Sequence, residues 1–520
     1  MVLAGSRPFE LAIATSRTLY ERSPVVLLAP ENDLAAQATG ASVAVGLGVP
    51  LLVAPAPTAP SATPSGGRSD TDPLREIRDE LERLEPATVL TVGAVPDPGV
   101  DGVSTVPVPT QAAAIGELTG TEFTNQRAVP EAELLEAVAS LERSEPALLA
   151  LDAAPPVAEE STDNDQIPPV EPAEPLDTVL FLVSEADQGG HASLAATATA
   201  RAAGAQVVLL DNPDPRADSN LIALLGRQEH SHIVALGDRF GAPDRLRQRL
   251  AVAATGVELP GGGQVLFPGR RLVALYGHPG TSALGVLGEQ PVNEAVERAR
   301  RVAAEYEALV NEPVVPAFEI IATVASASPG EDGDYSAESS IEHLRPWVDA
   351  AREAGIYVVL DLQPGHTDFL TQARRYEELL REPHVGLALD PEWRLAPGQR
   401  HMVHIGSVNA AEVNSVVSWL ADLTREANLP QKLLILHQFR LSMITDREQV
   451  DTGRDEVAVL IHADGHGNPA QKLDTWNILH RNPPPNVWWG WKNFYDEDSP
   501  TFSPQQTVAV EPSPVFISYQ

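Results

Sequence analysis

“YVVLDLQPGHTDFL”, residues 357–370, joins an apolar run to a group of polar residues. The run is typical of a buried strand, and it leads directly to Asp361, with Gln363 and His366 close behind. Asp368 precedes the helical pattern “FLTQARR” and has the position of an N-cap or first-turn acid. The polar residues therefore belong either to a functional site or to a loop with capping residues, and the flanking sequence decides between these two interpretations.

Similar apolar runs recur through the C-terminal part of the chain. Strands are predicted at 271–277, 314–325, 357–362, 385–390, 401–406, 432–439, 457–464 and 487–494. Segments with helical periodicity fill most of the intervals, although none separates 385–390 from 401–406. This alternation of strands and helices predicts a (β/α)8 TIM-like barrel over residues 269–520.

Two segments of the N-terminal half share one order of elements. “VVLLAPENDLAAQATGASVAVGLGVPLLVA” (25–54) predicts a strand, a helix of small residues and a strand, and residues 179–210 repeat that order. A helical stretch and a shorter strand follow each segment, ending at 88–93 and at 232–237. Strands that alternate with helices predict parallel sheets with right-handed crossovers, and the repeated order predicts an internal duplication.

Pro-rich stretches at 54–73 and 154–175 contain few apolar residues and are typical of linkers or exposed loops. We therefore predict two related parallel-sheet α/β domains ahead of the barrel. The predicted domains are 1–152 and 176–268, with a Pro- and acid-rich linker at 153–175 and the barrel at 269–520.

The chain is strongly acidic, with a net charge of −36 and a pI of about 4.6. This charge argues against a nucleic-acid partner and against docking on anionic lipid, because both would be repelled. The sequence contains no cysteine, which excludes disulfides, thiolate catalysis, zinc–thiolate sites and iron–sulfur clusters. The acidity itself is explained by solubility in salt or in a polyanionic cell wall.

No stretch reaches the roughly 18 uninterrupted apolar residues that a transmembrane helix needs. The opening “MVLAGSRPFELA” lacks the basic and long apolar regions of a signal peptide. Either the protein is cytoplasmic or this chain is a mature fragment that restarts at Met1. We favour the second, because of the resemblance described next.

“SPVVLLAPENDLAAQATGASVAVGLGVPLLVA” (23–54) resembles the cell-wall-binding repeat of bacterial surface proteins, in which a strand and a helix of small residues precede a “GVPLLL”-type strand. The family's usual Arg-x-x-Gly-x-x-Arg-Tyr-x-Thr motif is missing, and “ATSRTLYERSP” (14–24) only partly corresponds to it. The resemblance implies an exported, envelope-associated protein whose partner is a cell-wall or capsular polysaccharide.

The C-terminal block resembles a family of exported bacterial proteins that is often joined to cell-wall-binding repeats and has no assigned reaction. The resemblance lies in “GLALDPEWR” (386–394), “LPQKLLILHQF” (429–439), “WWGWKNFYDED” (488–498) and “PVFISYQ” (514–520). It implies a barrel like those of glycoside hydrolases. Catalytic roles must therefore be argued from the residues themselves.

Reactive groups of such a barrel gather at the C-terminal ends of its strands. Seven of the eight predicted strands carry polar residues there or near it: Tyr276, His278, Glu319, Asp361, Gln363, Asp390, Glu392, Trp393, Arg394, His437, Gln438, Arg440, His462, Asp464, His466, Trp491, Lys492, Tyr495 and Asp496. One polar strand end is usually a cap, but seven on one rim favour a binding or catalytic site.

Several carboxylates with aromatic and amide neighbours suit a carbohydrate, because aromatic faces stack on sugar rings. Glycoside hydrolysis requires one protonated and one ionised carboxyl group. The predicted catalytic residues are Asp361, Asp390, Asp464 and Glu319. The predicted substrate-binding residues are Tyr276, His278, Gln363, Glu392, Trp393, His437, Gln438, His462, Trp491, Lys492, Tyr495 and Asp496. Because Glu319 lies within the apolar run “PAFEIIA” (316–322), we expect burial to raise its pKa.

Other interpretations of these residues remain open. Glu319 could be paired with Lys432 or Arg440 in the barrel interior, Asp390 could cap the next turn, and each tryptophan could be core packing. The barrel would then be a non-catalytic scaffold, with its carboxylates sealed by ion pairs or by “FYDEDSPTFSP” (494–504).

A metal-dependent hydrolase is the second alternative. Its ligands would be His462, Asp464 and His466, which alternate along “HADGHG”, together with Asp361 or Asp390. The preferred interpretation needs neither a metal nor a cofactor, and the sequence does not indicate an oligomeric state.

Overall fold

The computed structural model describes residues 1–55, 74–123, 125–152, 167–184 and 188–520. They form two compact units, Met1–Leu250 and Ala251–Gln520. Within the described ranges, no helix has both the length and the apolar character that crossing a membrane requires. The two predicted linkers fall largely outside these ranges. Of their described residues, Ala54 ends a strand, whereas 55 and 167–175 have neither helix nor strand.

The first unit contains two parallel four-stranded sheets, with strand orders β3-β2-β4-β5 and β1-β10-β8-β9, and a separate parallel pair β6-β7. The strands are β1 (Val2–Leu3), β2 (Val25–Pro30), β3 (Leu51–Ala54), β4 (Thr88–Thr91), β5 (Ser104–Pro107), β6 (Asn125–Val129), β7 (Ala147–Leu151), β8 (Val179–Ser184), β9 (Gln206–Leu210) and β10 (His232–Leu236). The prediction of parallel α/β sheets in this half is confirmed.

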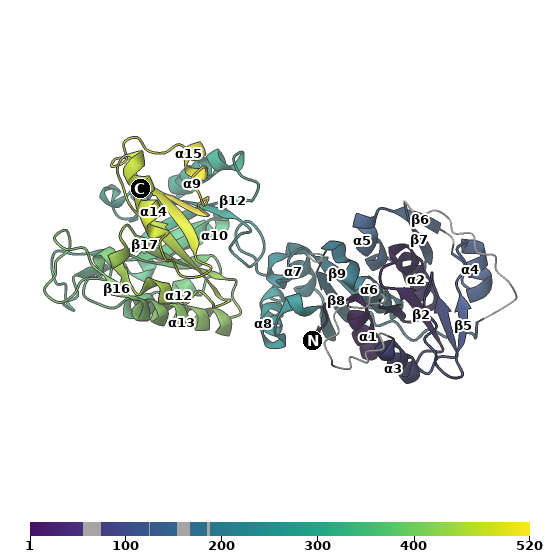
Figure 1. Cartoon of the computed structure of the whole chain (residues 1–520). Coiled ribbons are helices and arrows are strands. Elements are labelled where there is room, and N and C mark those ends of the chain that lie inside the picture. Colours follow the sequence, from purple (N-terminus) through teal and green to yellow (C-terminus); the bar gives the residue numbers. More distant parts are fainter. Residues whose placement is uncertain (56–73, 124, 153–166, 185–187) are drawn as a thin grey trace, which may run out of the picture. The chain divides into compact units, whose positions relative to one another are not determined.

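Helices alternate with the strands of the first unit (Figure 1). They are α1 (Pro8–Leu19), α2 (Leu34–Leu47), α3 (Arg75–Leu84), α4 (Ala112–Thr119), α5 (Leu134–Ala139), α6 (Leu194–Ala202), α7 (Ser219–Leu225) and α8 (Pro243–Ala253). Helices α1 and α6 contact strands of both four-stranded sheets. Helix α6 packs against both α1 and α2, and its Thr199 hydroxyl accepts a 3.0 Å hydrogen bond from the Leu51 N–H. One hydrophobic core therefore extends through both repeated segments, and β1 pairs with β10. The division into two related domains stays a prediction.

The second unit is a closed parallel barrel, as predicted. Its eight strands pair in the order β11-β12-β14-β15-β17-β19-β20-β21, and β21 pairs back with β11. They are β11 (Arg271–Gly277), β12 (Val314–Ala325), β14 (Tyr357–Leu362), β15 (Val385–Leu389), β17 (Lys432–Gln438), β19 (Val457–Ala463), β20 (Trp488–Asn493) and β21 (Phe516–Tyr519).

The prediction of a barrel strand at 401–406 is wrong. Residues 401–406 form turns and loop after β15, and Met402 and Val403 are 85% and 72% exposed. Apolar residues of a parallel barrel strand are covered on both faces, which is not the case here. The strand that closes the barrel is β21, whose short apolar run “FISY” comes near the end of the sequence.

Helices surround the barrel and follow most of its strands (Figure 1). The helices are α9 (Val292–Glu307), α10 (Ile341–Ala354), α11 (Phe369–Arg375), α12 (Glu377–Leu380), α13 (Ala410–Glu426), α14 (Pro469–Leu479) and α15 (Pro504–Val508). Short strands β13 (Ser336–Glu338), β16 (Val408–Asn409) and β18 (Ile444–Thr445) lie in the loops. Asp368 caps α11 by accepting the Thr371 N–H at 2.9 Å, as its position predicts.

Side chains of the barrel strands alternate between the helices outside and the interior. Outward residues such as Phe318, Leu360 and Leu436 belong to the core shared with the helices. The inner apolar core consists of residues two positions apart on the same strands, including Ala274, Ala317, Val359, Ala388, Ile435, Leu460 and Phe516. This period of two follows from strand geometry, and it decides which residue of each strand enters the site.

We expect Phe516→Ala to lower the free energy of unfolding by about 3–5 kcal/mol, because it opens a cavity inside the barrel beside the closing strand. Phe516 is fully buried and contacts the His462 ring, with 5.2 Å between the centroids. Urea denaturation of the full chain measures the change. Leu473→Ala is the control, because Leu473 is 38% exposed and should change stability by no more than about 0.5 kcal/mol. Equal losses in both variants would contradict a closed, packed barrel at β21.

Candidate active site

Seven barrel strands place a polar residue two positions beyond an inner core residue, and β20 places Lys492 two positions beyond Gly490. The set is Tyr276, Glu319, Asp361, Asp390, His437, His462, Lys492 and Ser518. The strands keep these residues at similar levels, since Tyr276 pairs in register with Glu319, His437 with His462, and Lys492 with Ser518. All eight are buried. We call this set the polar layer; it lies at the C-terminal end of the barrel, where such folds carry their chemistry.

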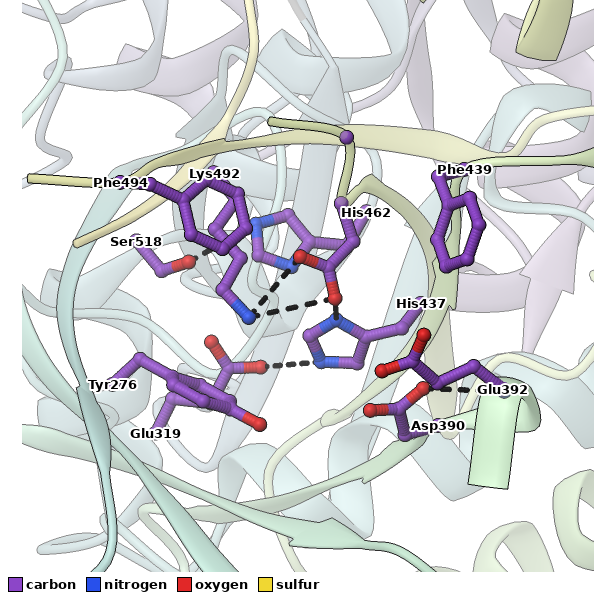
Figure 2. Close-up of polar contacts among 12 residues, drawn as sticks. Tyr276, Glu319, Asp390, Glu392, His437, Phe439, His462, Lys492, Phe494 and Ser518 are labelled. Atoms are coloured by element: carbon purple, nitrogen blue, oxygen red, sulfur yellow. Dashed lines mark hydrogen bonds and ion pairs between the residues drawn. The ribbon is translucent and has the colours of Figure 1, made fainter. Parts of the chain in front are cut away.

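His437 connects the two halves of the polar layer (Figure 2). Its Nε2 lies 2.8 Å from Glu319 Oε1, and its Nδ1 lies 3.0 Å from Asp464 Oδ2. Asp361 Oδ1 is 3.9 Å from the same Nε2. Burial alone would lower the pKa of His437, but the charges and hydrogen bonds of Glu319 and Asp464 raise it well above its usual value. The ring is therefore a buried imidazolium between two carboxylates.

The expectation that burial raises the pKa of Glu319 is wrong. Burial does act in that direction, but the adjacent His437 charge and hydrogen bond outweigh it, and the pKa is lowered. The suggested partners of Glu319 lie elsewhere: Lys432 Nζ donates to the Glu382 carbonyl, and the Arg440 guanidinium lies 5.4 Å from the Phe439 ring centroid. Glu319 is fully buried and does not line the cavity described below.

Lys492 forms a second charged contact with Asp464. Its Nζ lies 3.1 Å from Asp464 Oδ1, and it also sits 3.6 Å from the Tyr276 ring centroid (Figure 2). Burial would raise the pKa of Asp464, but Lys492 and His437 together lower it well below its usual range. Asp464 is thereby held in its ionised form.

Three other carboxyl groups are shifted in the opposite direction. Burial raises the pKa of Asp361 to about 6, against the opposing charge of His437, and Tyr276 donates to its Oδ2 at 2.9 Å. Burial and the Asp464 charge raise the pKa of Glu392 to about 7. Burial and the Glu392 charge raise the pKa of Asp390 well above its usual value. Asp390 also caps the next turn by accepting the Glu392 N–H at 3.4 Å, as one interpretation proposed.

A cavity of about 610 Å³ opens above the polar layer. Three carboxylates line it, Asp390, Glu392 and Asp464, together with Lys492 and Tyr276. Its other walls are both aromatic and polar: Trp393, His401, Met402, Phe439, Arg440, His466, Phe494, Gln363, Thr475 and Gln520, among others. The acids are therefore not sealed by “FYDEDSPTFSP”, although Phe494 of that segment forms part of the wall. Glu319 and Asp361 lie below, out of reach of the cavity.

The predicted catalytic residues thus come together in one barrel mouth but at two depths. Of the predicted binding residues, Tyr276, Gln363, Glu392, Trp393 and Lys492 line the cavity. Tyr495 and Asp496 instead line a neighbouring cavity of about 220 Å³.

Four other predicted binding residues contact protein groups rather than the main cavity. His437 and His462 belong to the buried polar layer, and His462 Nε2 lies 3.2 Å from Ser518 Oγ. Gln438 Oε1 accepts from Arg447 Nη1 at 3.0 Å. His278 Nε2 lies 3.1 Å from Ser339 Oγ.

Trp491 does not have the position expected for sugar stacking. It lies on the outer side of β20, 1% exposed, with its ring centroid 5.5 Å from that of Trp476 and 5.2 Å from that of Phe502. Neighbouring residues of a strand face opposite sides, so Lys492 and Trp491 cannot both enter the barrel. Because Lys492 faces inward, Trp491 faces the outer core, in agreement with the alternative interpretation that the tryptophans are core packing.

Sequence reasoning missed Ser518, Phe439, Phe494, His401 and Met402. Ser518 was missed because β21 was not recognised, although “VFISYQ” shows the same apolar run with polar positions that the other strands show. The signal for Phe439 and Phe494 is their place directly after β17 and β20. His401 and Met402 belong to the segment that was taken for a strand.

No protein-family model and no curated protein sequence matches this chain. Several solved structures align with it in part. Cwp6 from Clostridium difficile aligns with a TM-score of 0.30 and 13% identity over 63% of this chain and 63% of its own. Cwp8 from the same organism aligns with a TM-score of 0.32 and 13% identity, over 49% of this chain and 52% of its own.

Dihydropteroate synthase from Burkholderia cenocepacia also aligns, with a TM-score of 0.23 and 12% identity, over 49% of this chain and 86% of its own. TM-scores this low do not establish a shared arrangement of elements. No function is therefore transferred from these proteins, and the chemistry has to come from the site itself.

The predicted metal ligands do not assemble. His466 is exposed and lies against Phe494, with 5.8 Å between the ring centroids, whereas His462 is fully buried beside Ser518. A different group does come together inside the barrel: ligand atoms of Glu319, His437 and His462 lie within 4.8 Å of one another.

We expect Lys492→Met to lower the free energy of unfolding at pH 7 by about 3–5 kcal/mol, because Asp464 would lose one of its two buried cationic partners. Urea denaturation measures this change. Arg375→Met is the control, since the nearly half-exposed Arg375 pairs with Asp332 at 3.4 Å and with Glu338 at 3.5 Å, and loss of these surface pairs should cost at most about 1 kcal/mol. The double variant Lys492→Met/Asp464→Asn should lose less than the sum of the single variants. An additive double variant would contradict direct coupling of the pair.

Proposed function

We propose that the barrel binds and hydrolyses a glycan of the bacterial cell envelope, with Glu392 as the general acid and Asp464 as the ionised carboxylate. One observation carries the proposal: both carboxyl groups line the same cavity, and their pKa values are displaced in opposite directions. Glycosidases need this division of roles between two carboxyl groups.

The reaction follows from the two protonation states. Glu392, protonated near neutral pH, would donate its proton to the glycosidic oxygen as the bond to the anomeric carbon breaks. Asp464 would either attack that carbon or take a proton from the attacking water, and both roles need the ionised form that Lys492 and His437 maintain. Lys492 acts here as a positioning residue for Asp464.

The remaining wall of the cavity suits a sugar. Trp393, Phe439 and Phe494 offer aromatic faces, while the Gln363 amide, Arg440 and Lys492 offer hydrogen bonds to hydroxyl groups. A cavity of about 610 Å³ accepts a ligand of oligosaccharide fragment size.

The envelope location is part of the proposal. It rests on the resemblance of residues 23–54 to cell-wall-binding repeats and on a net charge of −36, which suits an extracellular polyelectrolyte environment. Export of the protein and a cell-wall or capsular polysaccharide as its partner follow from the same resemblance.

The first test is release of reducing ends from purified envelope polysaccharides by the full chain. We expect Glu392→Gln and Asp464→Asn each to reduce kcat/KM by about 10²–10⁴-fold, because each removes one proton-transfer or nucleophilic partner. On an aryl glycoside with a good leaving group, Glu392→Gln should recover much of its rate, because such a leaving group needs no acid, whereas Asp464→Asn should not.

Asp496→Asn is the matched control, because Asp496 lines the neighbouring cavity instead; its activity should equal that of the wild type. If wild-type protein releases no reducing ends from any envelope glycan, or if Glu392→Gln keeps full activity on the natural linkage, the hydrolase proposal is wrong and the scaffold interpretation takes its place.

The pH profile provides a second test. Glu392 acts in its protonated form, so kcat/KM should fall as pH rises through its pKa of about 7. Asp464 acts in its ionised form and its pKa is lowered, so no loss is expected on the acid side down to pH of about 4, the ordinary range for aspartate. In Lys492→Met the acid-side loss should move to higher pH. A rate that rises between pH 7 and 9 would exclude Glu392 as the acid.

A further inference from the structure

Three polar atoms in the barrel interior make no hydrogen bond to the described residues. They are Glu319 Oε2, Asp361 Oδ1 and His462 Nδ1. All three side chains are fully buried. A buried polar atom without a partner costs about 1–3 kcal/mol, so three such atoms in one small region call for a common ligand.

Their surroundings have the dimensions of an ion site. Ligand atoms of Glu319, His437 and His462 lie within 4.8 Å of one another. His437 Nε2 is 2.8 Å from Glu319 Oε1 and 3.9 Å from Asp361 Oδ1. Two ligands that each bind one ion at about 2 Å are themselves separated by roughly 3 Å, so small side-chain movements suffice to admit an ion.

Each histidine also has a hydrogen-bond partner at its second ring nitrogen, as metal-binding histidines usually do. His437 Nδ1 lies 3.0 Å from Asp464 Oδ2, and His462 Nε2 lies 3.2 Å from Ser518 Oγ (Figure 2). His462 Nδ1 is thereby left without a partner, and His437 Nε2 faces Glu319 Oε1, which is itself one of the proposed ligands. The close backbone of β20 accommodates the His462 ring only because residue 490 is glycine: a Cβ there would lie 2.7 Å from His462 Cδ2.

The charges balance with a divalent ion in place. Glu319 and Asp361 supply two negative charges to the site, and Asp464 beside it is paired with Lys492 at 3.1 Å. On binding, the ion replaces the Nε2 proton that makes His437 cationic in the absence of a metal. A divalent cation with two carboxylates and two neutral imidazoles then sums to zero, which is the condition for placing ionised groups in a dry interior.

We propose that the barrel interior holds a divalent transition-metal ion, most readily zinc, bound by Glu319, His437 and His462 with Asp361 as the fourth ligand. Two imidazoles and two carboxylates suit zinc, whereas calcium and magnesium prefer ligands that are all oxygen. None of the four ligands lines the cavity, so the site is of the closed, structural kind. It would stabilise the barrel and hold Asp464 in place through His437, and it does not depend on the proposed hydrolysis.

The test uses the full chain, stripped with a chelator and freed of it, then titrated with zinc chloride by calorimetry. We expect one zinc ion per chain and a higher melting temperature in its presence. Glu319→Gln and His462→Gln, which remove one ligand each at nearly unchanged volume, should weaken zinc binding by on the order of 100-fold or more. Ser518→Ala, which only frees the second nitrogen of His462, should weaken it by about 10-fold to 100-fold.

Three control variants should bind zinc like the wild type. His384→Gln changes a buried histidine elsewhere, whose Nε2 lies 3.0 Å from the Val348 carbonyl. Asp334→Asn changes the acidic group formed by Asp332, Asp334 and Glu338. Glu392→Gln changes the proposed acid, so that failure of the metal site and failure of hydrolysis are separated.

Circular dichroism and urea midpoints of the stripped variants establish that each is folded. Stripped, folded wild-type protein that takes up no zinc overturns the proposal and leaves water as the interior ligand. Loss of zinc binding in Asp334→Asn with retention in Glu319→Gln and Ser518→Ala also overturns it, because the ion would then lie in the acidic loop.

Discussion

The polar layer of the barrel is the constraint on which the rest of the site depends. Eight parallel strands close into one cylinder, and each contributes a polar side chain at the same end, where water has little access. Charges in such a place must neutralise one another. His437 meets this condition by lying between Glu319 and Asp464, and Lys492 meets it by pairing with Asp464 above the Tyr276 ring. The lower interior stays apolar and gives this network a rigid base.

The same network also separates the acids that face the cavity. Asp464 has two cationic neighbours and its pKa is lowered, whereas the half-buried Glu392 and the buried Asp390 lie beside other carboxylates and their pKa values are raised. Residues that do not line the cavity, such as His437, thus decide the protonation state of those that do. The proposed hydrolysis uses the acids that line the cavity, and the proposed ion lies deeper in the same barrel, among residues that do not line it.

Much of the candidate site could be predicted from the sequence because two simple rules operate together. Side chains of a strand alternate, and parallel strands end at one rim. Asp361, Asp390 and Asp464 each lie at the end of an apolar run, so these two rules predict that they meet at one barrel mouth. Where the alternation was not applied, the expectation failed: Trp491 faces the outer core while Lys492 faces inward. Residues 401–406 resembled a strand locally, but the exposure of Met402 and Val403 shows that no second layer covers them.

The sequence by itself determined the fold class, since strand and helix patterns are local and a parallel barrel follows from their alternation. It also determined the acidity, the absence of thiol chemistry and the polar strand ends. Only the tertiary structure decided the depth and the protonation state of each acid. Glu319 reads as an isolated buried carboxylate along the chain, yet its pKa falls because His437, 118 positions away, lies at 2.8 Å. A pKa depends on charges a few ångströms away in space, and barrel closure, not sequence distance, places those charges.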